Sequence, residues 1–143
     1  MRVLIADDDP IYRGMVEELL SEWGMQVTTA DDGQSAWRAM QNDPEIELAI
    51  LDWMMPGMQG DEVCQQIKLQ GDRDVFVLLI TGSRNREEIT KVLVAGADDY
   101  VLKPFEAIDL KIRVRNAMRT LRLLEEIRAL QAAQPTKLTA EAS

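Results

Sequence analysis

The sequence VLIADDDP, residues 3–10, joins a mostly apolar run directly to three consecutive aspartates and a proline. An unbroken apolar run is typical of a strand that is covered on both faces, as in a parallel sheet. Three adjacent carboxylates repel one another, and burying any of them costs more still. The end of this first strand therefore requires a nearby positive charge, or separate roles for the three acids.

The composition narrows the classes of function. The chain has 143 residues, and its formal net charge of −9 is unsuited to direct nucleic-acid binding. It has no histidine and a single cysteine, Cys64, which excludes histidine-based catalysis, a phosphohistidine on this chain, structural zinc and an internal disulfide. No apolar run approaches the roughly 20 residues of a membrane span, and no secretory signal is recognisable. We therefore expect a cytoplasmic protein without a membrane partner.

Apolar runs alternate with helix-like segments along the whole chain. Strand-like runs cover residues 2–6, 25–30, 47–52, 75–81 and 99–103, and helical patterns cover residues 10–24, 33–41, 60–70, 86–97 and 110–133. This alternation predicts an α/β fold with a parallel sheet, helices on both of its faces and right-handed crossovers. Ligands of such folds bind outside the carboxyl ends of the strands, so residues at those ends are the candidates for function.

Chemically active side chains stand where four of the predicted strands end. They are Asp7, Asp8 and Asp9 after the first strand, Asp52 on the third, Thr81 on the fourth and Lys103 on the fifth. Oxygen ligands without histidine or cysteine favour a hard cation, with Mg²⁺ as the first choice. A lysine and a hydroxyl beside that ion suit a phosphoryl group, and a carboxylate can itself accept one. This edge therefore predicts phosphoryl transfer to an aspartate.

The three adjacent acids are interpreted differently from one another. Asp9 precedes Pro10, and aspartate followed by proline is a common pair at the N-cap and first position of a helix. We therefore expect Asp9 to cap the next helix, whereas Asp7 and Asp8 hold a metal ion.

Four motifs carry a resemblance to a known family. They are VLIADDDP at 3–10, AILDWMMPGMQG at 49–60, VFVLLITGS at 75–83 and AGADDYVLKPF at 95–105. In this order and spacing, residues 1–120 resemble the response-regulator receiver domain of two-component signal transduction. The resemblance implies a flavodoxin-like, doubly wound sheet of five parallel strands in the order 2-1-3-4-5, with five helices. It also implies Mg²⁺ as cofactor and, as partner in a phosphorelay, a histidine kinase or histidine phosphotransfer protein acting in trans.

The resemblance assigns the metal and acceptor roles by position. Asp52 is the phosphoacceptor and also a metal ligand. Asp8 binds Mg²⁺ directly, and Asp7 acts mainly through a water on the metal. Met54 supplies its backbone carbonyl, so the identity of its side chain is not essential.

The resemblance also assigns the groups that respond to the phosphoryl group. Thr81 senses it, Lys103 bridges to it, and Tyr100 is an aromatic switch whose ring turns inward on activation. The Lys103–Pro104 peptide bond is cis in similar proteins. Ser83 departs from the larger polar groups of many relatives, and we expect it to affect the lifetime of the phosphorylated state.

The last helical pattern continues beyond the end of a typical receiver. Residues 121–143 are expected to be a helical extension with a polar tail that is disordered from Pro135 onward, and a linker to a missing output domain is one interpretation of them. A heptad-like seam is formed by Leu110, Val114, Ala117, Leu121 and Leu124, and a second stripe by Leu123, Ile127 and Leu130. The extension predicts either a homodimer through the last helices or a simple amphipathic end. It is also similar to connectors that join receivers to diguanylate cyclase domains.

These observations predict a phosphorylation-activated switch that alters dimerisation, partner binding or an output domain. We expect it not to be a conventional enzyme but to catalyse its own aspartyl phosphorylation and dephosphorylation. One alternative is a haloacid-dehalogenase-like phosphatase, for which Asp7 and Asp9 give the D-x-D pattern. A second is a receiver-fold interaction module that acts without phosphorylation. A flavin carrier of flavodoxin type lacks support, because no Ser/Thr/Gly-rich loop follows the first strand.

Overall fold

The computed structural model describes residues 1–133, and the tail predicted to be disordered from Pro135 lies outside them. The strands are β1 (Arg2–Ala6), β2 (Gln26–Ala30), β3 (Ile46–Asp52), β4 (Phe76–Thr81) and β5 (Asp99–Leu102). The helices are α1 (Pro10–Glu22), α2 (Gly33–Asn42), α3 (Gly60–Gln70), α4 (Arg86–Val94) and α5 (Ala107–Ala133). Strands and helices alternate strictly, as the apolar pattern predicts.

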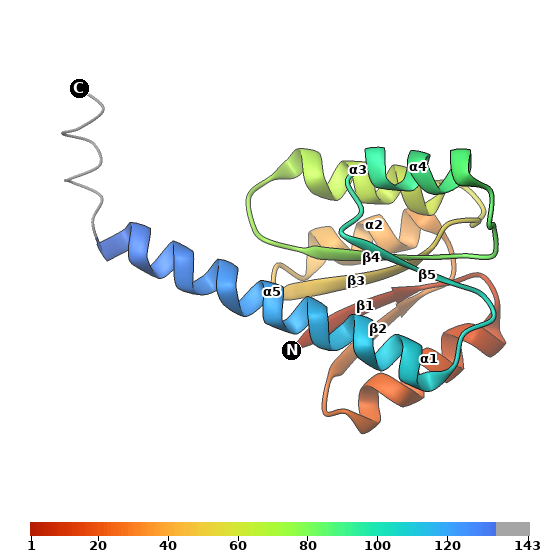
Figure 1. Cartoon of the computed structure of the whole chain (residues 1–143), viewed down its shortest axis with the longest axis horizontal. Helices are drawn as coiled ribbons and strands as arrows, with labels where there is room; N and C mark the ends of the chain where they lie inside the picture. Colours follow the sequence, from red (N-terminus) through yellow and green to blue (C-terminus); the bar gives the residue numbers. More distant parts are fainter. Residues whose placement is uncertain (134–143) are drawn as a thin grey trace.

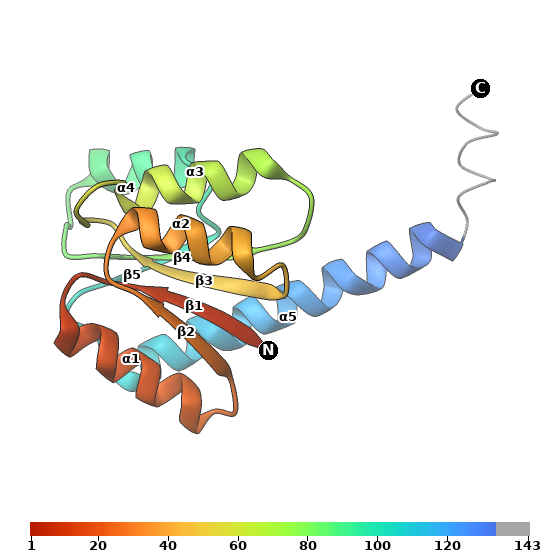
Figure 2. The same ribbon diagram turned by 180° about the vertical axis from the view of Figure 1, so that it is seen from behind.

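The five strands form one parallel sheet in the order β2-β1-β3-β4-β5. Helices α1 and α5 cover one face of the sheet, and α2, α3 and α4 cover the other (Figures 1 and 2). The predicted three-layer, doubly wound fold is therefore confirmed. The expected helix over residues 86–97 ends earlier, at Val94, because Gly96 takes a left-handed conformation with φ of 99° and turns the chain into β5.

Alternate residues of β1 supply two separate cores. Leu4 packs into the core beneath α2, α3 and α4, whereas Val3 and Ile5 pack into the core beneath α1 and α5. This division follows from the two-residue period of a strand. It explains why the strand sequences are continuously apolar instead of alternating. Cys64 is fully buried in the first core, as a small apolar residue would be.

The first helix begins as its sequence predicts. The Asp9 carboxylate accepts a hydrogen bond from the Ile11 backbone N–H at 2.9 Å, and Pro10 is the first helical residue. Asp9 is therefore the N-cap of α1, and its carboxylate is directed to the helix instead of the other acids.

Helix α5 packs on the sheet only along its first half. Its buried residues are Leu110, Val114, Ala117 and Leu121, and they contribute to the core beneath α1 and α5. Most of the heptad-like seam therefore faces the protein's own sheet and is not free to meet a second chain. Helical spacing alone cannot distinguish these two partners. Beyond the sheet the helix projects outward (Figures 1 and 2), and Leu123, Ile127 and Leu130 are exposed.

Among residues 1–133, no helix is both long and apolar enough to cross a membrane.

Candidate functional site

The parallel sheet brings the predicted site residues to one edge. Asp7 follows β1, Asp52 is the last residue of β3, and Thr81 is the last residue of β4. Lys103 follows β5, and its backbone N–H donates to the Thr81 carbonyl at 2.8 Å. Because all strands run in the same direction, residues from distant parts of the sequence meet at their carboxyl ends.

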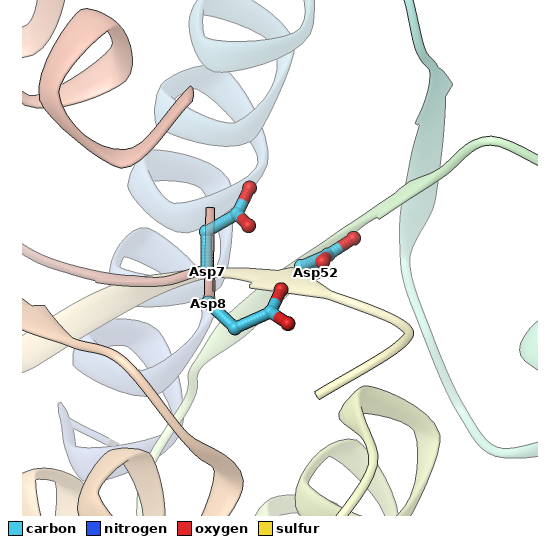
Figure 3. Close-up of side chains that lie close together, drawn as sticks. All are labelled: Asp7, Asp8 and Asp52. Carbon is cyan, nitrogen blue, oxygen red and sulfur yellow. The ribbon is translucent and has the colours of Figure 1, made fainter. Parts of the chain in front are cut away.

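Three carboxylates converge at the centre of this edge. One oxygen from each of Asp7, Asp8 and Asp52 lies within 4.8 Å of the others, and Figure 3 shows the three side chains grouped together. Asp7 and Asp52 are 1% and 6% exposed, whereas Asp8 is open to solvent. The Asp7 carboxylate is fixed by the Asp9 backbone N–H at 2.9 Å. All the candidate ligand atoms in this cluster are oxygens, and solvent reaches the cluster on the side of Asp8. This chemistry fits a hard divalent cation.

Lys103 supplies the positive charge closest to the acids. Its Nζ lies 3.1 Å from Asp7 Oδ2 and 3.5 Å from Asp52 Oδ1. The same ammonium lies 4.2 Å from the centre of the Tyr12 ring, on α1. One lysine cannot neutralise three carboxylates, so the group keeps an excess of negative charge.

The crowding of charge changes the acidity of Asp52. Burial, followed by the negative charge of Asp7, raises the pKa of Asp52 to about 7, although Lys103 opposes the rise. Burial acts to lower the pKa of Lys103, but the hydrogen bond to Asp7 and the charge of Asp52 outweigh it, so that pKa is raised. Asp52 is therefore destabilised as an anion unless a further cation joins the site.

The remaining predicted residues surround this centre. Thr81 is buried, and its hydroxyl oxygen accepts a hydrogen bond from the Ser83 backbone N–H at 3.1 Å. Tyr100 is half-buried and packs against the core beneath α2, α3 and α4. The Met54 side chain is 65% exposed, so it takes no part in the core. Within residues 1–133, no hydrogen bond or ion pair joins the Thr81 or Tyr100 side chain to the three acids.

Two further residues shape the site. A Cβ on Gly60 would lie 2.3 Å from the Asp52 carbonyl oxygen, so only glycine lets α3 start against the end of β3. Tyr12 contacts Lys103 and also pairs with the Phe105 ring at a centroid distance of 5.7 Å. Sequence reasoning missed both roles. Gly60 belongs to the motif at 49–60, but the sequence alone gives no physical reason for a glycine there. Tyr12 lies on a predicted helix, where an aromatic residue is normally assigned to packing.

The Lys103–Pro104 peptide bond is cis, as the resemblance implies. A Cβ on Gly82 would meet no atom within 4 Å, so the approach on this side is open.

The sheet order and the polar edge define a flavodoxin-like α/β protein with a site at the carboxyl ends of its strands. Residues 3–115 match the family described as the response regulator receiver domain, and the chain belongs to this family. The resemblance noted from the sequence is therefore confirmed.

Individual relatives indicate several contexts for such a domain. The chain is 35% identical to the phosphate regulon transcriptional regulatory protein PhoB of Escherichia coli over 121 residues, which are 84% of this chain and 52% of PhoB. The chemotaxis protein CheY4 of Vibrio cholerae superposes with a TM-score of 0.75 at 28% identity, covering 81% of this chain and 97% of CheY4. A probable two-component system response regulator/GGDEF domain protein gives a TM-score of 0.78 at 26% identity, covering 85% of this chain and 50% of that protein. The chain spans about half the length of the curated relatives it matches first.

Proposed function

We propose that this receiver accepts a phosphoryl group on Asp52 from a phosphohistidine of a partner histidine kinase or histidine phosphotransfer protein. The observation that carries this proposal is the position of Asp52, at the end of β3, with Asp7 and Asp8 beside it and Lys103 Nζ 3.5 Å from its carboxylate. These 143 residues contain no histidine, so the phosphoryl donor lies outside them.

The chemistry is a displacement at phosphorus. An Asp52 carboxylate oxygen forms the new P–O bond, the P–N bond of the phosphohistidine breaks, and the imidazole leaves with the electron pair. Lys103 is within reach of the charge that accumulates on the phosphoryl oxygens, and Thr81 places a hydroxyl donor at the neighbouring strand end. Both groups act by position and charge, and neither forms a bond to phosphorus.

The acidic group fits Mg²⁺ as the cofactor. Asp8 and Asp52 would hold the ion through their carboxylates, with Asp7 in the same cluster. The resemblance to receivers adds the Met54 backbone carbonyl as a further oxygen ligand. The ion would neutralise charge on both Asp52 and the incoming phosphoryl group. It would also offset the burial and the repulsion from Asp7 that together raise the pKa of Asp52.

The test is labelling by acetyl phosphate in Mg²⁺, followed by mass spectrometry of the intact protein. The wild type should gain one phosphoryl group, whereas Asp52→Ala should gain none. Asp43→Asn is a matched control, because Asp43 pairs with Arg2 and belongs to the opposite end of the sheet. Labelling of Asp52→Ala to the wild-type level would reject the proposal.

We propose that phosphorylation alters association or the activity of an attached domain. The exposed stripe of Leu123, Ile127 and Leu130 is an apolar surface on the outer part of α5 that the core leaves available, and it supports a homodimer through the last helices. Size-exclusion chromatography with light scattering, with and without beryllofluoride and Mg²⁺, tests this directly. A protein that stays monomeric under both conditions would reject the homodimer, and the response would then depend on a separate partner.

The response that this receiver controls depends on the whole protein in which it occurs. The relatives include a transcriptional regulator, a GGDEF domain protein and a chemotaxis protein that the chain covers almost completely. The expected lack of nucleic-acid contact therefore stays a prediction for residues 1–133 alone, as do the domain boundary near residue 120 and the cytoplasmic location.

The geometry weighs against the phosphatase alternative. Its D-x-D pattern requires Asp9 at the reaction centre, whereas the Asp9 carboxylate caps α1. Rapid release of phosphate from many phosphomonoesters would favour the phosphatase. A receiver that acts without phosphorylation would instead show no change in its NMR spectrum with beryllofluoride and Mg²⁺.

A further inference from the structure

We propose that Tyr12 is a positioning residue for Lys103, holding its ammonium against Asp52 through the face of the aromatic ring. This inference rests on the proposed function, because it concerns how the same site receives a phosphoryl group. It assigns a role to a residue of α1 that is not one of the acids or their lysine.

The contact has the geometry of a cation–π interaction. Lys103 Nζ lies over the Tyr12 ring at 4.2 Å from its centre, well inside the limit of about 6 Å for a significant attraction. The same atom is 3.1 Å from Asp7 and 3.5 Å from Asp52. One position of the ammonium therefore satisfies all three partners at once, and the ring does not draw the lysine away from the acids.

The ring is itself held in place. Tyr12 packs against Phe105 with an interplanar angle of 45° and a centroid distance of 5.7 Å. Phe105 follows Lys103 by two residues, so the first turn of α1 is joined to the segment after β5. The next residue on the helix, Arg13, donates to the Asp7 carbonyl at 2.8 Å. The first turn of α1 thus fixes both the lysine and one of its acidic partners.

An aromatic ring suits this task better than a further acid. A lysine has a flexible stem of four carbons, and ordering it costs conformational entropy. A fourth carboxylate would order the ammonium but add to the repulsion that, together with burial, already raises the pKa of Asp52. The ring attracts the cation through its quadrupole and brings no net charge, so it orders Lys103 without that penalty.

The test varies the electronic character of the ring in two variants that keep its shape, and removes the ring in a third. Three variants are compared with the wild type: Tyr12→Phe, Tyr12→Leu and a protein with pentafluorophenylalanine at position 12. Fluorination reverses the ring quadrupole and so removes the attraction to a cation. Beryllofluoride affinity in saturating Mg²⁺, measured by calorimetry, reports how well the site holds a phosphoryl-like group. Initial rates of labelling by acetyl phosphate provide a second readout.

Tyr12→Phe should bind beryllofluoride within about twofold of the wild type, since the ring face is retained. The pentafluorophenylalanine and Tyr12→Leu proteins should bind about fivefold more weakly and be labelled more slowly, as expected for one partly buried cation–π contact. Trp23→Leu is the matched control. It removes a second cation–π pair of the described residues, Lys111 over Trp23 at 5.9 Å, which lies outside the site, and it should change neither readout.

The outcomes separate the two proposals. Equal affinity of the phenylalanine and pentafluorophenylalanine proteins would overturn the inference, because a packing role depends on shape and not on the quadrupole. Binding by the wild type in that experiment would leave the proposed function intact. A wild type that binds no beryllofluoride and accepts no phosphoryl group would instead reject the proposed function, and the inference with it.

Discussion

Replacing Asp52 with asparagine should make the metal-free protein more stable, although it removes the proposed acceptor. Asp52 is 6% exposed and lies in one group with Asp7 and Asp8. Asparagine keeps the shape of the side chain and removes the charge that burial and Asp7 disfavour. Lys103 keeps its partner Asp7 at 3.1 Å, so the substitution leaves no isolated cation.

The size of the effect follows from the pKa of Asp52, which is raised from 3.8 to about 7 in the folded protein. Between these values the folded state holds a proton that the unfolded chain has lost, so wild-type stability falls as pH rises through this window. At about 1.4 kcal/mol for each pH unit, the full shift sets an upper limit of about 4 kcal/mol. Screening by water at the open side reduces this to about 1–2 kcal/mol, or a rise in Tm of about 3–7 °C for a domain of this size.

Thermal unfolding followed by circular dichroism, in EDTA from about pH 5 to about pH 8, measures this difference. The advantage of Asp52→Asn should grow up to about pH 7 and then level off. Added Mg²⁺ should shrink it, because the ion stabilises the wild type more than the variant. Asp43→Asn should show no such gain. A variant that is less stable than the wild type throughout, or whose advantage does not depend on pH, would refute the electrostatic reasoning.

Three further predictions concern the surroundings of the site. Gly60→Ala should lower the free energy of unfolding by about 1–3 kcal/mol in urea titrations, because its Cβ would lie 2.3 Å from the Asp52 carbonyl oxygen; an unchanged midpoint would contradict this. Asp9→Ala should lose about 1 kcal/mol from the cap of α1 but still be labelled by acetyl phosphate, and loss of labelling would place Asp9 among the reacting groups. Arg128→Ala removes an ion pair with Asp74 at 2.8 Å that is half-exposed, so the cost should stay below about 1 kcal/mol. A larger loss of stability would mean that this pair anchors α5.

The parallel sheet and the convergence of the acids could be predicted from the sequence pattern, whereas the strand order followed only from the resemblance to receiver domains. Continuous apolar strands require cover on both faces, and parallel strands bring Asp7 and Asp52 to the same edge whatever their separation along the chain. The capping of α1 by Asp9 could also be predicted, because an aspartate followed by a proline is a local sequence signal for the start of a helix.

Contacts between elements were harder to predict. Helical spacing showed that Leu110, Val114 and Leu121 form an apolar seam, but it did not reveal that their own sheet covers them. The contact of Tyr12 with Lys103 joins residues from opposite ends of the domain. No local sequence pattern predicts such a contact. Tyr12 is already explained as packing on a helix, and Lys103 as a charge at the end of a strand.

The length of α5 has a mechanical consequence. Its last buried residue is Leu121, and the helix continues to Ala133. At about 1.5 Å per residue, this outer part forms a rigid lever arm about 18 Å long. A tilt of about 5° where the helix leaves the sheet would move its far end by about 1.5 Å, more than the same tilt moves any atom at the pivot. A small change in the tilt of α5 at the sheet is thus converted into a larger displacement at Ala133, the far end of the described helix.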